Sequence, residues 1–144
     1  MATVDATRTT QADKYQILPP LDPETYEALK ANISIHGVKV PIVKDEAGLI
    51  LDGFARARIA EELGYECPES IESGLSEADK RALVRALNLS RRQHGQSAKR
   101  EVIAGQLRET PRLSNRRIAR VLGVDHKTVV SVRASMTGTG EIPQ

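Results

Sequence analysis

The chain has 144 residues, of which 40% are hydrophobic and only 3% aromatic, so its core must be built mainly from aliphatic side chains. This length allows one domain or two small ones, and no apolar stretch approaches the 18 residues of a membrane span. Scarce aromatic side chains argue against a binder of single-stranded nucleic acid. The single cysteine excludes an internal disulfide and favours a reduced, cytoplasmic setting.

The net charge of +2 conceals two oppositely charged halves. Residues 1–79 contain 7 Lys and Arg against 15 Asp and Glu, a balance of −8, whereas residues 80–144 contain 14 against 4, a balance of +10. This division predicts an acidic N-terminal unit joined to a basic C-terminal unit that binds a polyanion. The alternative is that the two halves attract each other.

The first 75 residues are predicted to form a lead-in and one mixed domain. Residues 1–13 contain no apolar segment and are expected to be disordered, whereas residues 14–75 are expected to fold as helices and short strands. Apolar periodicity and turn residues predict the elements. In chain order they are a strand at 15–20, a helix at 22–37, a hairpin with strands at 40–43 and 48–51, a helix between Gly53 and Gly64, and a short strand around Ile71.

Everything from Ser76 onward is predicted to be helical. Ser76 and Asp79 form a capping box that begins a helix, a loop is expected at 90–96, and another helix runs from about 97 to 109. Residues 76–136 are therefore expected to form an all-helical domain. Residues 137–144 are expected to be a flexible tail, with the alternative that the chain is a piece of a longer protein.

Residues 115–134 match the helix-turn-helix template. This motif needs a small residue where its second helix crosses its first, and a glycine in the turn, where the backbone is left-handed. Ala119 and Gly123 occupy these places, and Val129 and Val132 supply the apolar side of the second helix. The alternative is a helical hairpin that serves packing only.

The outer side of this motif predicts contacts to double-stranded DNA. Ser114 and Asp125 are the expected N-caps of its two helices. The residues expected near base edges in the major groove are His126, Lys127, Thr128, Val130 and Ser131. The residues expected on phosphates are Arg116, Arg117, Arg120 and Arg133. One such motif buries only about 600–1,000 Å², so we expect a homodimer; the alternative is a solvated basic face.

A second candidate site lies where an apolar strand meets a helix in the acidic half. Glycine at a helix N-terminus lets a phosphate approach the backbone amides, and arginine can bind phosphate oxygens with two hydrogen bonds. Gly53 and Arg56 have this arrangement, and Arg58 follows. The simpler interpretation of these residues alone is a turn without a ligand, with Asp52 as N-cap and the arginines in water.

The span from Tyr15 to Arg133 resembles the ParB/sulfiredoxin superfamily, specifically the small ParB-like proteins of phages, plasmids and actinobacteria. The family box Gly-Glu-Arg-Arg-x-Arg-Ala is matched at Gly53, Arg56 and Arg58, and a second box, Glu-Asn-x-Gln-Arg, is matched at two further positions, Asn88 and Arg91. Both boxes and the helix-turn-helix occur in the family's order. The resemblance implies an α+β fold, with a small ParB/sulfiredoxin-like mixed α/β domain followed by an all-α helix-turn-helix domain.

The resemblance also implies a nucleotide switch. In ParB proteins the two boxes bind the triphosphate of CTP with Mg²⁺, and the nucleotide converts a dimer into a clamp around DNA. By this resemblance the nucleotide-binding residues are Gly53, Arg56, Arg58, Asn88 and Arg91. It further implies a weak CTPase activity, a partition ATPase as partner, association with the nucleoid, and a role in plasmid, phage or chromosome partition or in transcriptional regulation.

Two departures from the first box leave alternatives open. Phe54 replaces the acidic residue and Ala55 replaces one arginine, so a plain repressor or partition adaptor with a decayed nucleotide pocket is the first alternative. Sulfiredoxin chemistry is excluded at this position, because Phe54 stands where that branch has its cysteine. The other alternative is an enzyme, either a nuclease or a nucleotide-dependent phosphotransferase, although no clustered carboxylate set supports it.

Overall fold

The computed structural model describes residues 14–91 and 95–142, so the predicted lead-in at 1–13 lies outside the described residues. The chain divides into two compact units, an N-terminal unit up to Arg81 and a C-terminal unit from Ala82 onward. The division falls inside a helix, whereas the sequence placed the domain boundary before that helix. In neither unit do the described residues form a helix long and apolar enough to cross a membrane.

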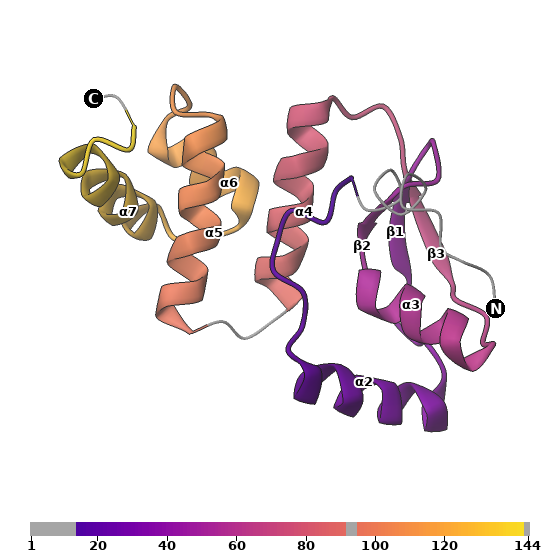
Figure 1. Ribbon diagram of the computed structural model, residues 1–144. Helices are drawn as coiled ribbons and strands as arrows, with labels where there is room; N and C mark the ends of the chain where they lie inside the picture. The colour runs from indigo at the N-terminus through magenta and orange to yellow at the C-terminus, as the bar shows by residue number, and fades with distance from the viewer. Residues whose placement is uncertain (1–13, 92–94, 143–144) are drawn as a thin grey trace. The chain divides into compact units, whose positions relative to one another are not determined.

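The N-terminal unit combines helices with a small sheet, as the α+β prediction required (Figure 1). Its elements in chain order are α2 (Pro23–His36), β1 (Ile42–Asp45), β2 (Ile50–Asp52), α3 (Phe54–Leu63), β3 (Glu69–Glu72) and the first turn of α4 (Glu77–Arg91). The strand order is β2-β1-β3. β1 pairs antiparallel with β2, as the predicted hairpin requires. β1 also pairs parallel with β3, and in this pairing Ile42 lies opposite Glu69. Helix α3 connects β2 to β3 and packs against α2 and β1.

The segment predicted as a strand at 15–20 is not a strand; it begins in a turn and continues without regular structure. Pro19 and Pro20 cannot donate backbone hydrogen bonds to a neighbouring strand. The segment is instead held by a side chain, because the Tyr15 ring is buried and its hydroxyl donates to Oε1 of Glu77 on α4 over 2.6 Å. The hydrogen bond between Tyr15 and Glu77 therefore holds this segment in place of the expected pairing with a strand.

A buried ion pair attaches the first turn of α4 to the sheet. Lys80 Nζ lies 2.9 Å from Oδ2 of Asp45, and both residues are buried. The other carboxylate oxygen of Asp45 accepts hydrogen bonds from the amides of Ala47 and Leu49, which closes the β1–β2 turn. Burial acts to raise the pKa of Asp45, but the hydrogen bonds from Lys80 and these amides outweigh it and hold the pKa below its usual value. This pair explains why the start of α4 belongs to the N-terminal unit.

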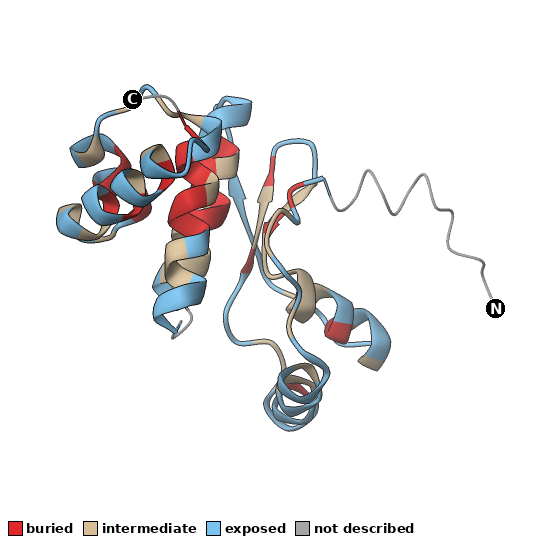
Figure 2. Cartoon of the chain, turned by 60° about the vertical axis from the view of Figure 1, so that its left-hand side comes forward, coloured by how far each residue is buried: buried red, intermediate tan, exposed pale blue. Residues whose placement is uncertain are grey.

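The C-terminal unit is entirely helical in its described residues. It contains the rest of α4, α5 (Gln96–Glu109), α6 (Asn115–Leu122) and α7 (His126–Gly138), close to the predicted helices. Residues 92–94 of the predicted loop lie outside the described residues. Buried residues, coloured red in Figure 2, gather on the helices of this unit. The core consists of Ile103, Ala104, Leu107, Ile118, Ala119, Leu122, Val129, Val132, Met136 and Ile142.

The segment after α7 takes part in this core. The sequence led us to expect a tail without a core residue at 137–144, yet Ile142 is buried. Arg108 on α5 donates to the Glu141 carboxylate over 2.9 Å, which holds the segment against the unit. That expectation was wrong for residues 137–142, because a single apolar side chain after a glycine turn carries no periodic signal in the sequence.

A buried arginine joins α4 to α5 within the C-terminal unit. The Arg85 guanidinium bonds both carboxylate oxygens of Glu109, at 2.7 and 3.0 Å, and also the side-chain oxygen of Gln106. A Cβ atom at Gly105 would lie 3.3 Å from Nε of Arg85, so the glycine provides room for the guanidinium to pass. The charge of Arg85 is thus neutralised inside the protein by Glu109.

Candidate DNA-binding surface and candidate nucleotide site

Helices α6 and α7 are joined by a tight turn whose local geometry agrees with the sequence. Ser114 Oγ accepts from the Arg117 amide over 3.1 Å, and Asp125 Oδ1 accepts from the Lys127 amide over 3.3 Å, so both predicted N-caps are confirmed. Gly123 has a φ of +70°, in the left-handed region that glycine tolerates best. The first helix therefore ends where the sequence placed the turn.

The inward side of this helix pair is the one expected from the sequence. The residues predicted to pack inside, Ile118, Ala119, Leu122, Val129 and Val132, are all buried. Their burial turns the opposite side of α7 outward, where Lys127, Val130 and Ser131 are exposed and His126 and Thr128 are partly exposed. The structure thus places the five residues expected near base edges on the accessible side of one helix.

The predicted phosphate-binding arginines separate into two groups. Arg116, Arg117 and Arg120 are exposed on α6. Arg133 behaves differently, because its three guanidinium nitrogens donate to Oδ1 of Asn115 and to the backbone carbonyls of Pro111 and Leu113. Arg133 therefore holds the loop that precedes α6, a structural role that the sequence did not indicate.

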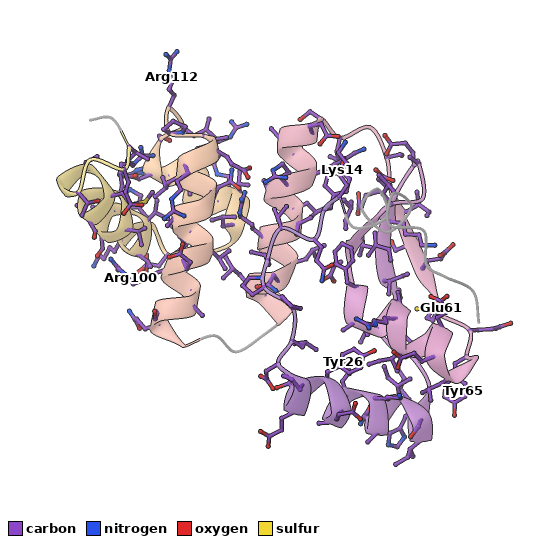
Figure 3. The ribbon with its side chains drawn as sticks, viewed as in Figure 1. Lys14, Tyr26, Glu61, Tyr65, Arg100 and Arg112 are labelled. Carbon is purple, nitrogen blue, oxygen red and sulfur yellow. The ribbon has the colours of Figure 1, made fainter. Side chains whose placement is uncertain are left out.

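Arg100 on α5 lies beside the outer side of α7 and was missed in the sequence. Its Nη1 donates to Ser131 Oγ over 3.1 Å, and its position is marked in Figure 3. A further cation, Arg112, points away from the helices in the same view. Only a contact between residues 31 positions apart identifies Arg100, and no local signal could have done so.

The candidate nucleotide residues of the N-terminal unit have structural roles. Gly53, at a φ of +97°, is the N-cap of α3, and a Cβ atom there would lie 2.6 Å from Cγ2 of Ile42. Arg56 donates to Asp52 Oδ2 over 3.1 Å and to the Val40 carbonyl over 3.2 Å. Asp52 is thus an ion-pair partner and not the N-cap that the sequence suggested. These contacts explain Gly53 and Arg56 without a ligand.

Arg58 lies apart from this turn, on the exposed side of α3. Its Nε is 3.6 Å from Glu62, and its guanidinium stands 5.8 Å from the centre of the Tyr26 ring on α2. Tyr26 is labelled in Figure 3. The remaining candidates, Asn88 and Arg91, are on the part of α4 that belongs to the C-terminal unit. Within the N-terminal unit the structure therefore brings Gly53 and Arg56 together.

A mixed α/β unit followed by a helical unit agrees with a ParB-like fold, and one solved structure supports this fold. The chain is similar to the C-terminally truncated chromosome-partitioning protein ParB from Caulobacter crescentus complexed to the centromeric parS site, with a TM-score of 0.57, 17% identity, and coverage of 88% of this chain and 73% of that one. The same protein complexed with CTP-gamma-S matches with a TM-score of 0.47, 20% identity, and coverage of 88% and 78%. No protein-family model and no curated protein matches the sequence.

Proposed function

We propose that this chain binds double-stranded DNA, with α7 in the major groove and the arginines of α6 on the phosphates. One observation carries the proposal: the apolar residues of α6 and α7 are buried, so the outer side of α7 and three α6 arginines are exposed together. They belong to the half of the chain with a charge balance of +10. A positive surface around an exposed helix side is what duplex DNA requires.

The biological role that fits this activity is plasmid, phage or chromosome partition or transcriptional regulation. The ParB-like fold supports it, since the similar solved protein is a chromosome-partitioning protein bound to its centromeric site. We further propose a homodimer, because a single helix pair buries too little surface for a specific site, and a partition ATPase as partner. A protein with these properties would be associated with the nucleoid.

The proposal is tested by the salt dependence of binding to a labelled duplex, measured by fluorescence anisotropy. Arg117→Ala, at an exposed α6 arginine expected on a phosphate, should lower the slope of log K against log salt by about 1, because the loss of one phosphate contact releases one counterion fewer. Lys39→Ala removes the same charge from the N-terminal unit and should leave the slope unchanged. Binding that is absent, or that does not respond to salt, would overturn the proposal.

A nucleotide switch at the start of α3 is the second candidate. The observation in its favour is that Gly53 offers no side-chain cap to the first turn of α3, where an anion would be stabilised, while the Arg56 guanidinium lies beside it. The residues present fit a triphosphate only in part, because Arg56 is already paired with Asp52. CTP with Mg²⁺ would therefore have to compete with a carboxylate of the protein itself.

This competition provides a direct calorimetric test. If CTP binds here, Asp52→Asn should strengthen binding and Arg56→Gln should weaken it, whereas Arg112→Gln, with the same loss of charge in the other unit, should change nothing. Titrations that stay flat for every nucleoside triphosphate would leave the plain repressor or partition adaptor. Mg²⁺-dependent nicking of DNA would instead support the nuclease alternative, and release of phosphate from the nucleotide would support the phosphotransferase alternative.

A further inference from the structure

The outer side of α7 carries an exposed apolar side chain among cations. Val130 is 40% exposed, and among the described residues of the C-terminal unit it is the one large hydrophobic side chain that is exposed. The neighbouring valines, Val129 and Val132, are buried in the core. A β-branched residue is also a poor helix former at a position where packing does not require it. Neither the core nor the helix accounts for Val130.

The surroundings of Val130 favour a duplex over a protein as the partner. Lys127 lies one helical turn before it, and Arg116, Arg117 and Arg120 are exposed on the neighbouring α6. A single apolar side chain is far smaller than the patches of a few hundred Å² that mark protein-binding sites. In the major groove, however, one apolar side chain is enough to contact the C5-methyl group of a pyrimidine.

Val130 also lies on a side of α7 that is held in place from a neighbouring helix. Arg100 donates from α5 to Oγ of Ser131, the next residue along α7, and α7 packs against both α5 and α6. This support restricts the rotation and sliding of α7 relative to the other helices of its unit. Recognition of one methyl group needs such restriction, because the contact is short-ranged.

We propose that Val130 is a specificity-determining residue that contacts the C5-methyl group of a pyrimidine in the major groove. This inference rests on the proposed function and extends it to one position of the DNA site. Thymine carries this group in unmodified DNA, and 5-methylcytosine carries it in modified DNA. The expected preference is therefore for a methylated pyrimidine, with thymine as the ordinary source.

The test begins with a duplex selected from a random library by the full chain. Each thymine of this duplex is then replaced by uracil, which removes only the methyl group. At one position in each half-site, the replacement of thymine by uracil should weaken binding about fourfold. This is the fold-change expected for the loss of one exposed methyl group. At that position cytosine should bind more weakly than 5-methylcytosine. These arms use the unaltered protein and do not depend on the folding of any variant.

Variants assign the effect to the side chain. Val130→Ala should bind the thymine and uracil duplexes equally, and Val130→Thr, which keeps one methyl group, should retain part of the difference. Thr128→Ser removes a methyl group from a neighbouring candidate residue. This variant should retain the full difference in binding between the thymine and uracil duplexes. Each variant is accepted only if its circular dichroism spectrum matches that of the unaltered protein.

The outcomes separate this inference from the proposed function. Duplex binding without a uracil-sensitive position, or sensitivity that persists in Val130→Ala, would overturn the role of Val130 and leave DNA binding intact. A loss of discrimination in Thr128→Ser alone would likewise overturn it. Failure to bind any duplex would overturn the proposed function itself.

Discussion

The two units of the protein use their cations in opposite ways. In the described part of the N-terminal unit, the cations with an acidic partner are Lys14, Lys30, Lys44, Arg56, Arg58 and Lys80. In the C-terminal unit Arg85 and Arg108 are paired, whereas Arg116, Arg117, Arg120 and Lys127 form no ion pair with the described residues. A cation without an acidic neighbour is available to an external anion, so the comparison locates the proposed DNA-binding surface better than net charge does.

The units also differ in what holds them together. The C-terminal unit has a contiguous aliphatic core across three helices, whereas in the N-terminal unit a buried Asp45–Lys80 pair connects the sheet to α4. An apolar core is weakened by removal of volume, and a buried ion pair by removal of one charge or by a change of pH.

The largest effect is expected from Leu107→Ala in the C-terminal core. Leu107 is fully buried, so the substitution should lower the free energy of unfolding of this unit by about 2–5 kcal/mol, through lost burial and a residual cavity. Urea unfolding followed by circular dichroism measures it. Ile35→Ala, at a residue 76% exposed on α2, should change stability by no more than about 0.5 kcal/mol. Equal effects of the two substitutions would contradict the assignment of the core.

Gly53→Ala should destabilise the N-terminal unit more than Gly48→Ala does. Both glycines have positive φ, and each substitution incurs the backbone cost of about 1–2 kcal/mol. At Gly53 the new Cβ would also meet Ile42, which should add about 1–3 kcal/mol, whereas the space at Gly48 is open. The difference between the two unfolding free energies measures the contact. Equal losses would mean that the turn relaxes to admit a side chain.

Acid should weaken the N-terminal unit through Asp45. Its pKa is below the ordinary value when folded, so its contribution is present above about pH 4 and is lost as the pH falls further. Asp45→Asn should lower the unfolding midpoint at pH 7, and this difference should shrink as the pH is lowered toward 3. Glu46→Gln, at the exposed second partner of Lys80, should have a smaller effect. A constant difference across this pH range would show that the charge of Asp45 is not what stabilises the fold.

The smallest effect is expected at the N-cap of α6. Ser114→Ala removes the hydroxyl that accepts from the Arg117 amide and should cost about 1 kcal/mol. Ser135→Ala, at an exposed position on α7, is the matched control and should be neutral or slightly stabilising, since alanine is the better helix former. Thermal unfolding compares the two variants. If Ser114→Ala leaves the stability unchanged, water takes the place of the Ser114 hydroxyl as acceptor for the Arg117 amide.

Structural features that depend on residues close together in the sequence could be predicted. The caps at Ser76, Ser114 and Asp125 act within a few residues of their partners, and the β1–β2 hairpin and the turn at Gly123 have local signals too. The buried side of α6 and α7 follows from apolar periodicity, which is a direct consequence of helix geometry.

The roles of individual charged groups could not be predicted in the same way. The sequence shows that Arg56, Arg100 and Arg133 are cations, but their partners come from distant positions or from backbone carbonyls that only the folded chain brings near. The same holds for Asp45 with Lys80, which are 35 residues apart, and for the burial of Tyr15 and Ile142.

Sequence by itself determined the division of charge, the mixed-then-helical order of elements and the side of α7 that faces outward, because composition, periodicity and capping are local properties of the chain. Tertiary structure alone decided which cations are neutralised internally and which remain exposed. The physical reason is that a hydrogen bond or ion pair depends on separations of a few ångströms, and these are set by packing between elements far apart in the sequence.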